Sequence, residues 1–150
     1  MKRALQIVGG LVLLFGLIQL VPYGRHHTNP PVTGEPAWDS PRTRELAVRA
    51  CFDCHSNQTE WPWYSHVAPI SWFLQNHVDG GRKHLNFSTW NAAAPQRAAK
   101  HAAREVTSGD MPLTTYTWMH PLSRLTDAEK TELAKGLAAT FGSDASADHH

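Results

Sequence analysis

The chain has 150 residues, of which 41% are hydrophobic and 18% are charged, and this length accommodates at most one small domain with its appendages. Its 14 lysine and arginine residues nearly balance its 13 aspartate and glutamate residues, which leaves a net charge of +1. The chain therefore lacks the basic field that holds nucleic acid, and we exclude nucleic-acid binding.

The N-terminal segment predicts a membrane anchor over residues 1–25. Residues 4–21 form an apolar run interrupted by only two glutamines. As a helix, this run would reach about 27 Å, the short end of a bilayer span. Lys2 and Arg3 mark the cytoplasmic side, although an arginine on the far flank weakens this bias. A cleaved signal peptide is the alternative, but residues 21–25 show no small-residue cleavage pattern, so we expect an uncleaved single-pass transmembrane helix.

A proline- and glycine-rich stretch over residues 26–40 predicts an extended linker between the anchor and a folded domain. The domain begins with a helix, because Ser40 is a typical N-cap and Pro41 fits the first helical position. We expect this domain to cover residues 41–142 and a disordered polar tail to follow over 143–150.

The two cysteines of the chain lie in the sequence Cys-Phe-Asp-Cys-His at residues 51–55. Leu46 and Cys54 share one helical stripe, so we expect this sequence at the C-terminal end of the first helix. Cys-x-x-Cys-His is the attachment signature of c-type haem. Cys51 and Cys54 would each form a thioether with a haem vinyl group, and His55 would bind the iron as proximal ligand. The sequence therefore predicts one haem c, attached covalently through both cysteines.

Two further kinds of site use cysteines at this spacing. A structural zinc site needs four ligands, and no closely spaced histidine pair follows, since six residues separate His77 from His84. A redox dithiol would follow a strand in a βαβ pattern, which the sequence does not show. Zinc binding and dithiol chemistry both stay open, but haem attachment explains the motif better.

The stretch after this motif is strongly aromatic. Residues 56–69 include Trp61, Trp63 and Tyr64, and a loop this aromatic would be costly to expose. We expect these rings to wrap the haem, with ordinary core packing as the alternative for each ring.

A further helix is predicted to start after Pro69 and to end at Gly80-Gly81, because apolar residues recur at helical spacing. The residues of its apolar face are Ile70, Phe73, Leu74, His77 and Val78. On this face, His77 is expected to be a buried, hydrogen-bonded histidine rather than an iron ligand.

Two more helices complete the prediction. An alanine-rich helix over residues 95–107 would stop at Gly109. The last helix opens with a capping box of Thr126 and Glu129. Its core stripe and final cap comprise Leu133, Leu137, Phe141 and Gly142. No segment of useful length alternates with period two, so we expect an all-α domain.

A second axial ligand for the iron is expected just before the last helix. Met111 lies in a loop, and Pro112 stiffens that loop, which would help to hold a weak thioether ligand. Met119 is the second candidate sulfur, and a histidine such as His120, or an open coordination site, would take the place of either methionine. A thioether ligand would raise the reduction potential relative to a second histidine.

These motifs resemble the bacterial haem-binding domain family of monohaem c-type cytochromes. The sequence blocks that carry the resemblance cover residues 28–34, 51–57, 61–65, 68–72, 81–90, 111–113 and 119–121. The resemblance implies a small cytochrome c-like helical domain around one haem, and electron transfer as its activity. The order of the helices is also similar to that of class I cytochromes c.

The same resemblance suggests how the haem would be held. By analogy with class I cytochromes, a backbone carbonyl of residues 62–69 would accept a hydrogen bond from the proximal imidazole. Arg82, Lys83 or Trp90 would bind the haem propionates, with a solvated surface patch as the alternative for the two charged residues.

The resulting hypothesis is a membrane-anchored electron carrier that is not an enzyme. We expect a single-pass protein of the bacterial inner (cytoplasmic) membrane, with its C-terminal domain facing the periplasm. Its partners would be redox proteins in or at the membrane and the cytochrome c attachment machinery. The alternative function is a haem-based sensor or small-ligand-binding haem protein with a weak or displaceable sixth ligand.

Overall fold

The computed structural model describes residues 1–91 and 96–142, and within these ranges it contains helices and no strands. The α-helices are α1 (Lys2–Ile18), α2 (Pro41–Ala50), α3 (Phe52–His55), α4 (Ile70–His84), α5 (Ala102–Ser108), α6 (Thr114–Met119) and α7 (Asp127–Phe141). Short 3₁₀ helices lie between them: η1 (Trp63–His66), η2 (Arg97–His101) and η3 (Pro121–Ser123). The predicted all-α fold is confirmed.

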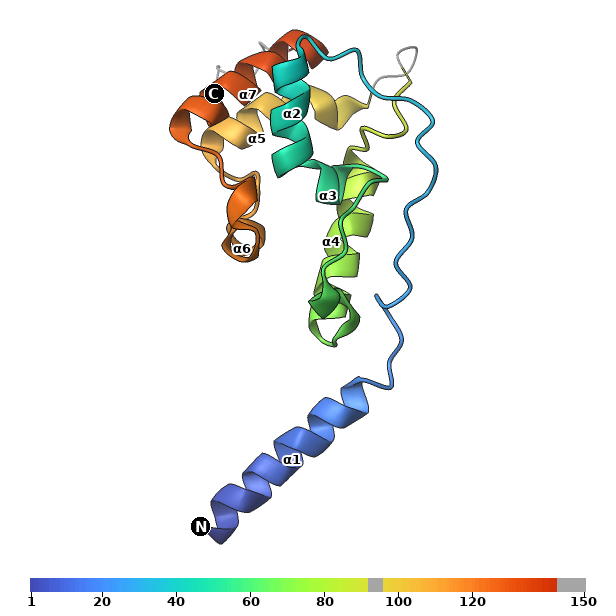
Figure 1. Cartoon of the computed structure of the whole chain (residues 1–150), viewed down its shortest axis with the longest axis vertical. Coiled ribbons are helices and arrows are strands. Elements are labelled where there is room, and N and C mark those ends of the chain that lie inside the picture. Colours follow the sequence, from blue (N-terminus) through green and yellow to red (C-terminus); the bar gives the residue numbers. More distant parts are fainter. Residues whose placement is uncertain (92–95, 143–150) are drawn as a thin grey trace, which may run out of the picture.

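Helix α1 projects away from the rest of the chain (Figure 1). It has 17 residues and none of them is buried, so its apolar side chains are exposed. In the described part of the chain, no helix is both long and apolar enough to reach across a bilayer. The transmembrane helix predicted over residues 4–21 is therefore not supported, because the helix ends at Ile18 and the chain continues in turns.

The segment after α1 runs along the domain and is hydrogen-bonded to it. We call residues 19–34 the strap. The side-chain amide of Gln19 donates to the carbonyl of Ala68 at 2.9 Å and accepts from its backbone N–H at 3.0 Å. Further along, the side chain of Asn29 donates to the carbonyl of Thr59 at 2.9 Å. The strap, which spans the end of the predicted anchor and the start of the predicted linker over residues 26–40, therefore ties α1 to the domain.

Helix α2 begins as predicted, since Pro41 is its first residue and the Ser40 hydroxyl accepts from the Thr43 N–H at 3.1 Å. The helix ends at the cysteine motif, because Cys51 leaves helical geometry with φ −125° and ψ −32°. The chain restarts as α3, whose Phe52 is buried in the core. The motif thus lies on a short helix of its own and not on the end of one continuous helix.

Helix α4 continues through Gly80 and Gly81 to His84, beyond its predicted end. Glycine lowers helix stability by up to about 1 kcal/mol but does not break the backbone pattern. The glycines instead leave space for a neighbour. A Cβ atom at Gly81 would collide with the carbonyl oxygen of Cys54, so the missing side chain allows α4 to lie directly against α3.

The hydrophobic core forms where α2, α5 and α7 pack together (Figure 1). Leu46, Leu133 and Leu137 are among its fully buried side chains. Helix α7 opens with the predicted capping box, in which the Thr126 hydroxyl accepts from the Glu129 N–H at 3.2 Å and the Glu129 carboxylate accepts from the Thr126 N–H at 2.8 Å. Gly142 ends α7, also as predicted.

The predicted alanine-rich helix is present as η2 followed by α5, which stops at Gly109 with a φ of 85°. Its expected start at Pro95 lies outside the described residues, as does the predicted tail over residues 143–150. Helix α6 was not predicted, although it carries Met119.

Candidate functional site

Two adjoining cavities lie beside the cysteine motif. The inner cavity, of about 250 Å³, is bordered by Cys51, Cys54 and His55, by α4 and by the Met111 loop. The outer cavity, of about 490 Å³, lies between α4 and α6 and has an almost wholly apolar lining. The side chains that border both cavities are those of Cys54, His77, Leu113 and Tyr116. We call the two adjoining cavities the hollow, and together they have the size and character of the spaces that large apolar cofactors occupy.

Helix α4 forms one wall of this hollow. The face predicted to enter a core instead borders the outer cavity, and its Phe73 is 48% exposed. Val78 is buried, as predicted. His77 donates its Nδ1–H to the carbonyl of Phe73 at 2.8 Å, so it is hydrogen-bonded as expected, but it lies at the cavity wall and not inside a core. Gly80 also borders the inner cavity, where an added Cβ atom would meet no atom within 4 Å.

The short helix α3 holds the motif firmly against the rest of the domain. The Ser56 hydroxyl donates to the carbonyl of buried Phe52 at 2.7 Å, which closes the C-terminal end of α3. The carbonyl of His55 accepts from the Phe87 N–H at 2.8 Å. Because Phe52 and Phe87 are core residues that stack on each other, the motif is fixed from two sides.

The imidazole of His55 has the orientation and protonation state that an iron ligand needs. Its Nδ1 lies 3.1 Å from the carbonyl oxygen of Gly81 and 3.0 Å from that of Leu85. A carbonyl oxygen only accepts, so Nδ1 carries the proton and Nε2 keeps its lone pair. Burial lowers the pKa of His55, which favours the neutral ring. The acceptors thus lie on α4 and the residue after it, and the expectation of a carbonyl from residues 62–69 is wrong.

Both cysteines are free thiols that border the inner cavity. Burial raises the pKa of Cys51 to about 12, and burial together with the nearby Asp53 raises the pKa of Cys54 to about 11. Redox dithiols depend on lowered cysteine pKa values, so these shifts do not favour a dithiol. Within residues 1–91 and 96–142, no group of three or more His, Cys, Asp or Glu side chains is arranged to hold a metal ion.

The two candidate methionines lie in different places. Met111 borders the inner cavity together with the cysteine motif, and its N–H donates to the carbonyl of Glu105 at 2.9 Å. Met119 ends α6, borders the outer cavity and is 45% exposed. The geometry therefore brings Met111, and not Met119, into the cavity that contains His55.

His120, the histidine considered as sixth ligand, has both ring nitrogens engaged. Its Nδ1–H donates to the carbonyl of Tyr116 at 3.0 Å, so its Nε2 accepts from the Tyr64 hydroxyl at 3.2 Å. This arrangement leaves no free lone pair on the His120 ring.

The aromatic residues predicted to wrap the haem divide into two groups. Tyr64 borders the outer cavity, as that prediction requires. Trp61 and Trp63 border neither cavity: Trp61 stacks on His27 of the strap with 4.1 Å between the ring centroids, and Trp63 is 80% exposed. The structure therefore gives Trp61 a role in holding the strap.

The predicted propionate ligands also lie away from the cavities. Arg82 makes four hydrogen bonds within the protein, to the carbonyls of Thr28 and Ser56 and to the side chains of Asn29 and Thr59, at 2.8–3.0 Å. Lys83 is exposed and borders neither cavity.

Trp90 packs against Phe141 with 5.0 Å between ring centroids, on the side of the core facing the end of α7. Neither Arg82 nor Trp90 borders the two cavities, because each side chain contacts another part of the protein.

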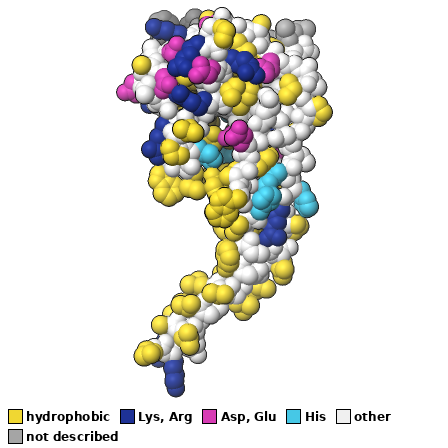
Figure 2. Space-filling model, in the orientation of Figure 1, with side chains coloured by type: hydrophobic (Ala, Val, Ile, Leu, Met, Phe, Trp, Pro, Cys, Tyr) yellow, Lys and Arg dark blue, Asp and Glu magenta, His cyan; other side chains and the backbone are white. Residues whose placement is uncertain are grey.

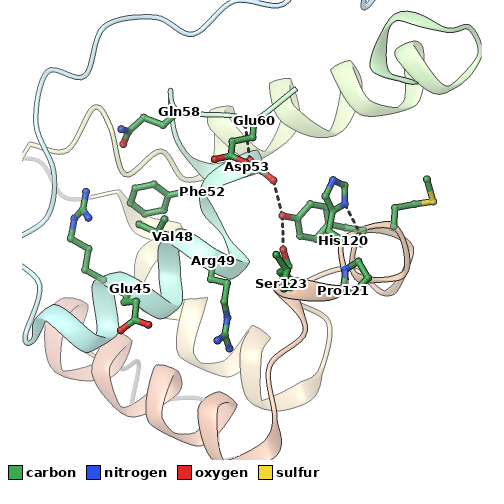
Figure 3. A pocket seen from close by; sticks show the side chains of 14 residues that line it. Glu45, Val48, Arg49, Phe52, Asp53, Gln58, Glu60, His120, Pro121 and Ser123 are labelled. Carbon is green, nitrogen blue, oxygen red and sulfur yellow. Dashed lines mark hydrogen bonds between the residues drawn. The ribbon is translucent and has the colours of Figure 1, made fainter. Parts of the chain in front are cut away.

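Sequence reasoning missed Tyr116, which borders both cavities and a groove on the other side of α6. This groove, of about 740 Å³, has several charged side chains in its lining, lies against α2 and shares Asp53 and Tyr116 with the inner cavity (Figure 3). Burial raises the pKa of Tyr116, so the phenol stays protonated and donates to Asp53 at 2.7 Å. No spacing in the sequence connects a residue between the cysteines with a tyrosine on an unpredicted helix.

Charged and apolar side chains gather at different ends of the domain. Figure 2 shows Lys, Arg, Asp and Glu over the upper part, around α2 and α7, and hydrophobic side chains on the underside near α6. The large exposed apolar residues around the outer cavity include Phe73, Trp118 and Met119. The mouth of the hollow is thus apolar.

No curated protein and no solved structure gives a match to this chain. A family model does match, over residues 13–139, and its description is that of a haem-binding domain. The hollow fits that description, because it places an oriented histidine, two free thiols and an unfilled Gly80 face around one apolar space. The chain therefore belongs to the haem-binding domain family, and it is a haem protein.

Proposed function

We propose that the protein is a monohaem c-type cytochrome that carries single electrons and is not an enzyme. The observation that carries this proposal is the inner cavity, which brings together Cys51, Cys54, the free Nε2 of His55 and the sulfur-bearing Met111. In this proposal Cys51 and Cys54 would hold the haem through thioether links, and His55 and Met111 would bind its iron. The haem supplies the one-electron redox change of its iron.

Backbone and side-chain groups of this protein would tune the redox chemistry of the haem. The carbonyls of Gly81 and Leu85 hold His55 in one tautomer and orientation. The apolar outer cavity would surround much of the porphyrin with low-dielectric protein, and low solvent exposure influences the reduction potential. The thioether of Met111 favours the ferrous state over what a second histidine would give.

Covalent attachment is tested directly by haem staining after denaturing electrophoresis. Full-length protein produced together with cytochrome c attachment machinery should keep its haem, and a variant with both Cys51→Ser and Cys54→Ser should lose it. Matched haem-free protein from cells without the machinery controls for nonspecific stain. A wild-type band without haem would show that the protein is not a c-type cytochrome.

The proposal extends to location and partners. We propose that α1 anchors the domain to the bacterial inner membrane, with the domain on the periplasmic side, where redox proteins in or at the membrane exchange electrons with it. The support is that the apolar side chains of α1 are exposed, with Leu5 at 75% and Leu11 at 61%, and find no cover within the described chain. An apolar helix of this kind is stable in contact with lipid.

The sensor function predicted as the alternative from the sequence differs in its sixth ligand. A displaceable or absent ligand would let the reduced protein bind carbon monoxide at once, whereas a well-held methionine would slow that binding. The position of Met111 beside the motif supports the electron carrier as the first choice.

A further inference from the structure

A pair of side chains joins the haem motif to the helix on the opposite side of the hollow. Asp53 is one of the two residues between the cysteines, and its Oδ2 accepts from the Tyr116 hydroxyl at 2.7 Å. Its second oxygen, Oδ1, accepts from the N–H of Glu60 at 2.8 Å. Asp53 therefore connects α3 both to the loop after the motif and to α6 (Figure 3).

Tyr116 is held from several directions. Because its single hydroxyl proton goes to Asp53, the phenol oxygen accepts from the Ser123 hydroxyl at 2.9 Å. Its ring stacks on His120 with 4.4 Å between centroids and an interplanar angle of 22°. The ring also borders the inner cavity, the outer cavity and the groove beside α2. Tyr116 is thus a wall between the haem hollow and the open groove beside α2.

The position of α6 matters because it directly follows the Met111 loop. At its start, this loop is tied to α5 through the N–H of Met111 and the carbonyl of Glu105. On its far side, the hydrogen bond from Tyr116 ties α6 to α3, the helix that carries Cys54 and His55. The two sides of the hollow are therefore connected at a point close to both proposed axial ligands.

We propose that Asp53 and Tyr116 form a latch that holds α6 and the Met111 loop closed over the haem, so that both are positioning residues for the sixth ligand. This inference rests on the proposed cytochrome function. A hydrogen bond to a charged carboxylate is stronger than one between neutral groups, so breaking it loosens the loop measurably. The latch would also explain why an acidic residue lies between the two cysteines.

The test compares Tyr116→Phe with Tyr23→Phe in full-length, haem-loaded protein. Both changes remove one phenol oxygen, but Tyr116 contacts Asp53, whereas Tyr23 lies in the strap and borders neither cavity. Tyr116→Phe should speed carbon monoxide binding to the reduced protein by about tenfold and increase hydrogen exchange in α6, since the loop opens more often. Tyr23→Phe should stay within about twofold of wild type, the change expected for a loss outside the latch. Equal behaviour of the two variants would overturn the latch.

Changes at Asp53 provide a second, independent reading. Asp53→Ala should be at least as fast as Tyr116→Phe, because it removes the shared hydrogen bond and also the acceptor of the Glu60 N–H. The double variant should be no faster than Asp53→Ala, because the hydrogen bond to Tyr116 is already lost there. Asp53→Asn retains an acceptor oxygen, so its rate of carbon monoxide binding should stay close to that of wild type. Additive effects of the two single changes would contradict the latch. If wild type carried no haem, the proposed function would fail, and hydrogen exchange in α6 of Tyr116→Phe would still decide whether the pair holds α6.

Discussion

At the scale of single residues, the best-defined feature is the hydrogen bonding of the His55 ring through one nitrogen only. One nitrogen donates to two carbonyls, and the second is left with its lone pair intact for the role of ligand. Histidines that bind metals commonly have such a partner, which fixes the tautomer and the ring orientation. The carbonyls belong to α4 and its C-terminal end, so the position of the proximal ligand depends on a helix that contributes no ligand itself.

The sixth ligand gives a prediction at the same scale. Met111→Ala in the haem-loaded protein should remove the near-infrared band of methionine-bound ferric iron, because Met111 is the methionine beside the motif. Met111→His should lower the midpoint potential. Because axial ligands tune haem potentials over about 0.8 V, this shift in potential should exceed the shift caused by replacing any cavity side chain that does not bind the iron. Absorption spectra and potentiometric titration measure both effects.

Met119→Ala is the matched control, because it removes the same side chain from the outer cavity. It should leave the near-infrared band in place. Loss of the band in Met119→Ala, with its retention in Met111→Ala, would show that the loop rearranges around the haem and that Met119 is the ligand.

At the scale of secondary structure, α4 is the element on which the site is built. Gly81 lets it approach α3, its last turn supplies an acceptor for His55, and its N-terminal half forms the wall of the outer cavity. The two glycines predict a helix end when they are considered by themselves. The helix continues because its packing against α3 outweighs their low propensity.

The free space over Gly80 provides a test of what occupies the inner cavity. Gly80→Ala adds a methyl group that meets no atom of the chain, so the haem-free protein should gain about 0.5–1 kcal/mol of stability from the better helix former. If the haem lies against this face, the same methyl group should reduce the haem content per polypeptide. Thermal unfolding of the haem-free protein and pyridine haemochrome assays of the loaded protein measure the two effects.

Gly10→Ala in α1 is the matched control, because its new Cβ atom also meets nothing within 4 Å but lies outside both cavities. Its haem content should equal that of wild type. Full haem content in Gly80→Ala would place the porphyrin away from α4.

At the scale of the whole molecule, the exposed apolar side chains of α1 predict that the protein attaches to membranes. Full-length protein should sediment with membranes in bacterial cell fractions and resist extraction by high salt, because the contact is apolar. Replacing Leu11 and Leu14, which are 61% and 56% exposed, with lysine should release the protein into the soluble fraction without changing its haem content. Release of the wild-type protein by salt alone would contradict an apolar anchor.

The sequence predicted those features of the molecule whose interacting residues lie close together in the chain. Local chemistry was sufficient for the Ser40 cap and the Thr126–Glu129 capping box, since each depends on residues three apart. The cysteine motif likewise placed His55 correctly beside both thiols. In each of these cases the partners are close in sequence.

Long-range contacts account for what the sequence did not show. Arg82 was predicted as a possible propionate ligand from its charge, and the sequence did not indicate that its hydrogen bonds include one to a carbonyl of the strap, 54 residues away in sequence. Trp90 likewise packs on Phe141, far along the chain. Neither contact leaves a local pattern, because each partner lies far away in the sequence.

The hydrogen bonds of Arg82 have a mechanical consequence. Arg82 grips the strap at Thr28 and the end of the haem motif at Ser56, and its immediate neighbour Gly81 supplies a carbonyl that steadies His55. Two consecutive residues of α4 therefore join the strap, the end of the haem motif and the acceptor that orients His55.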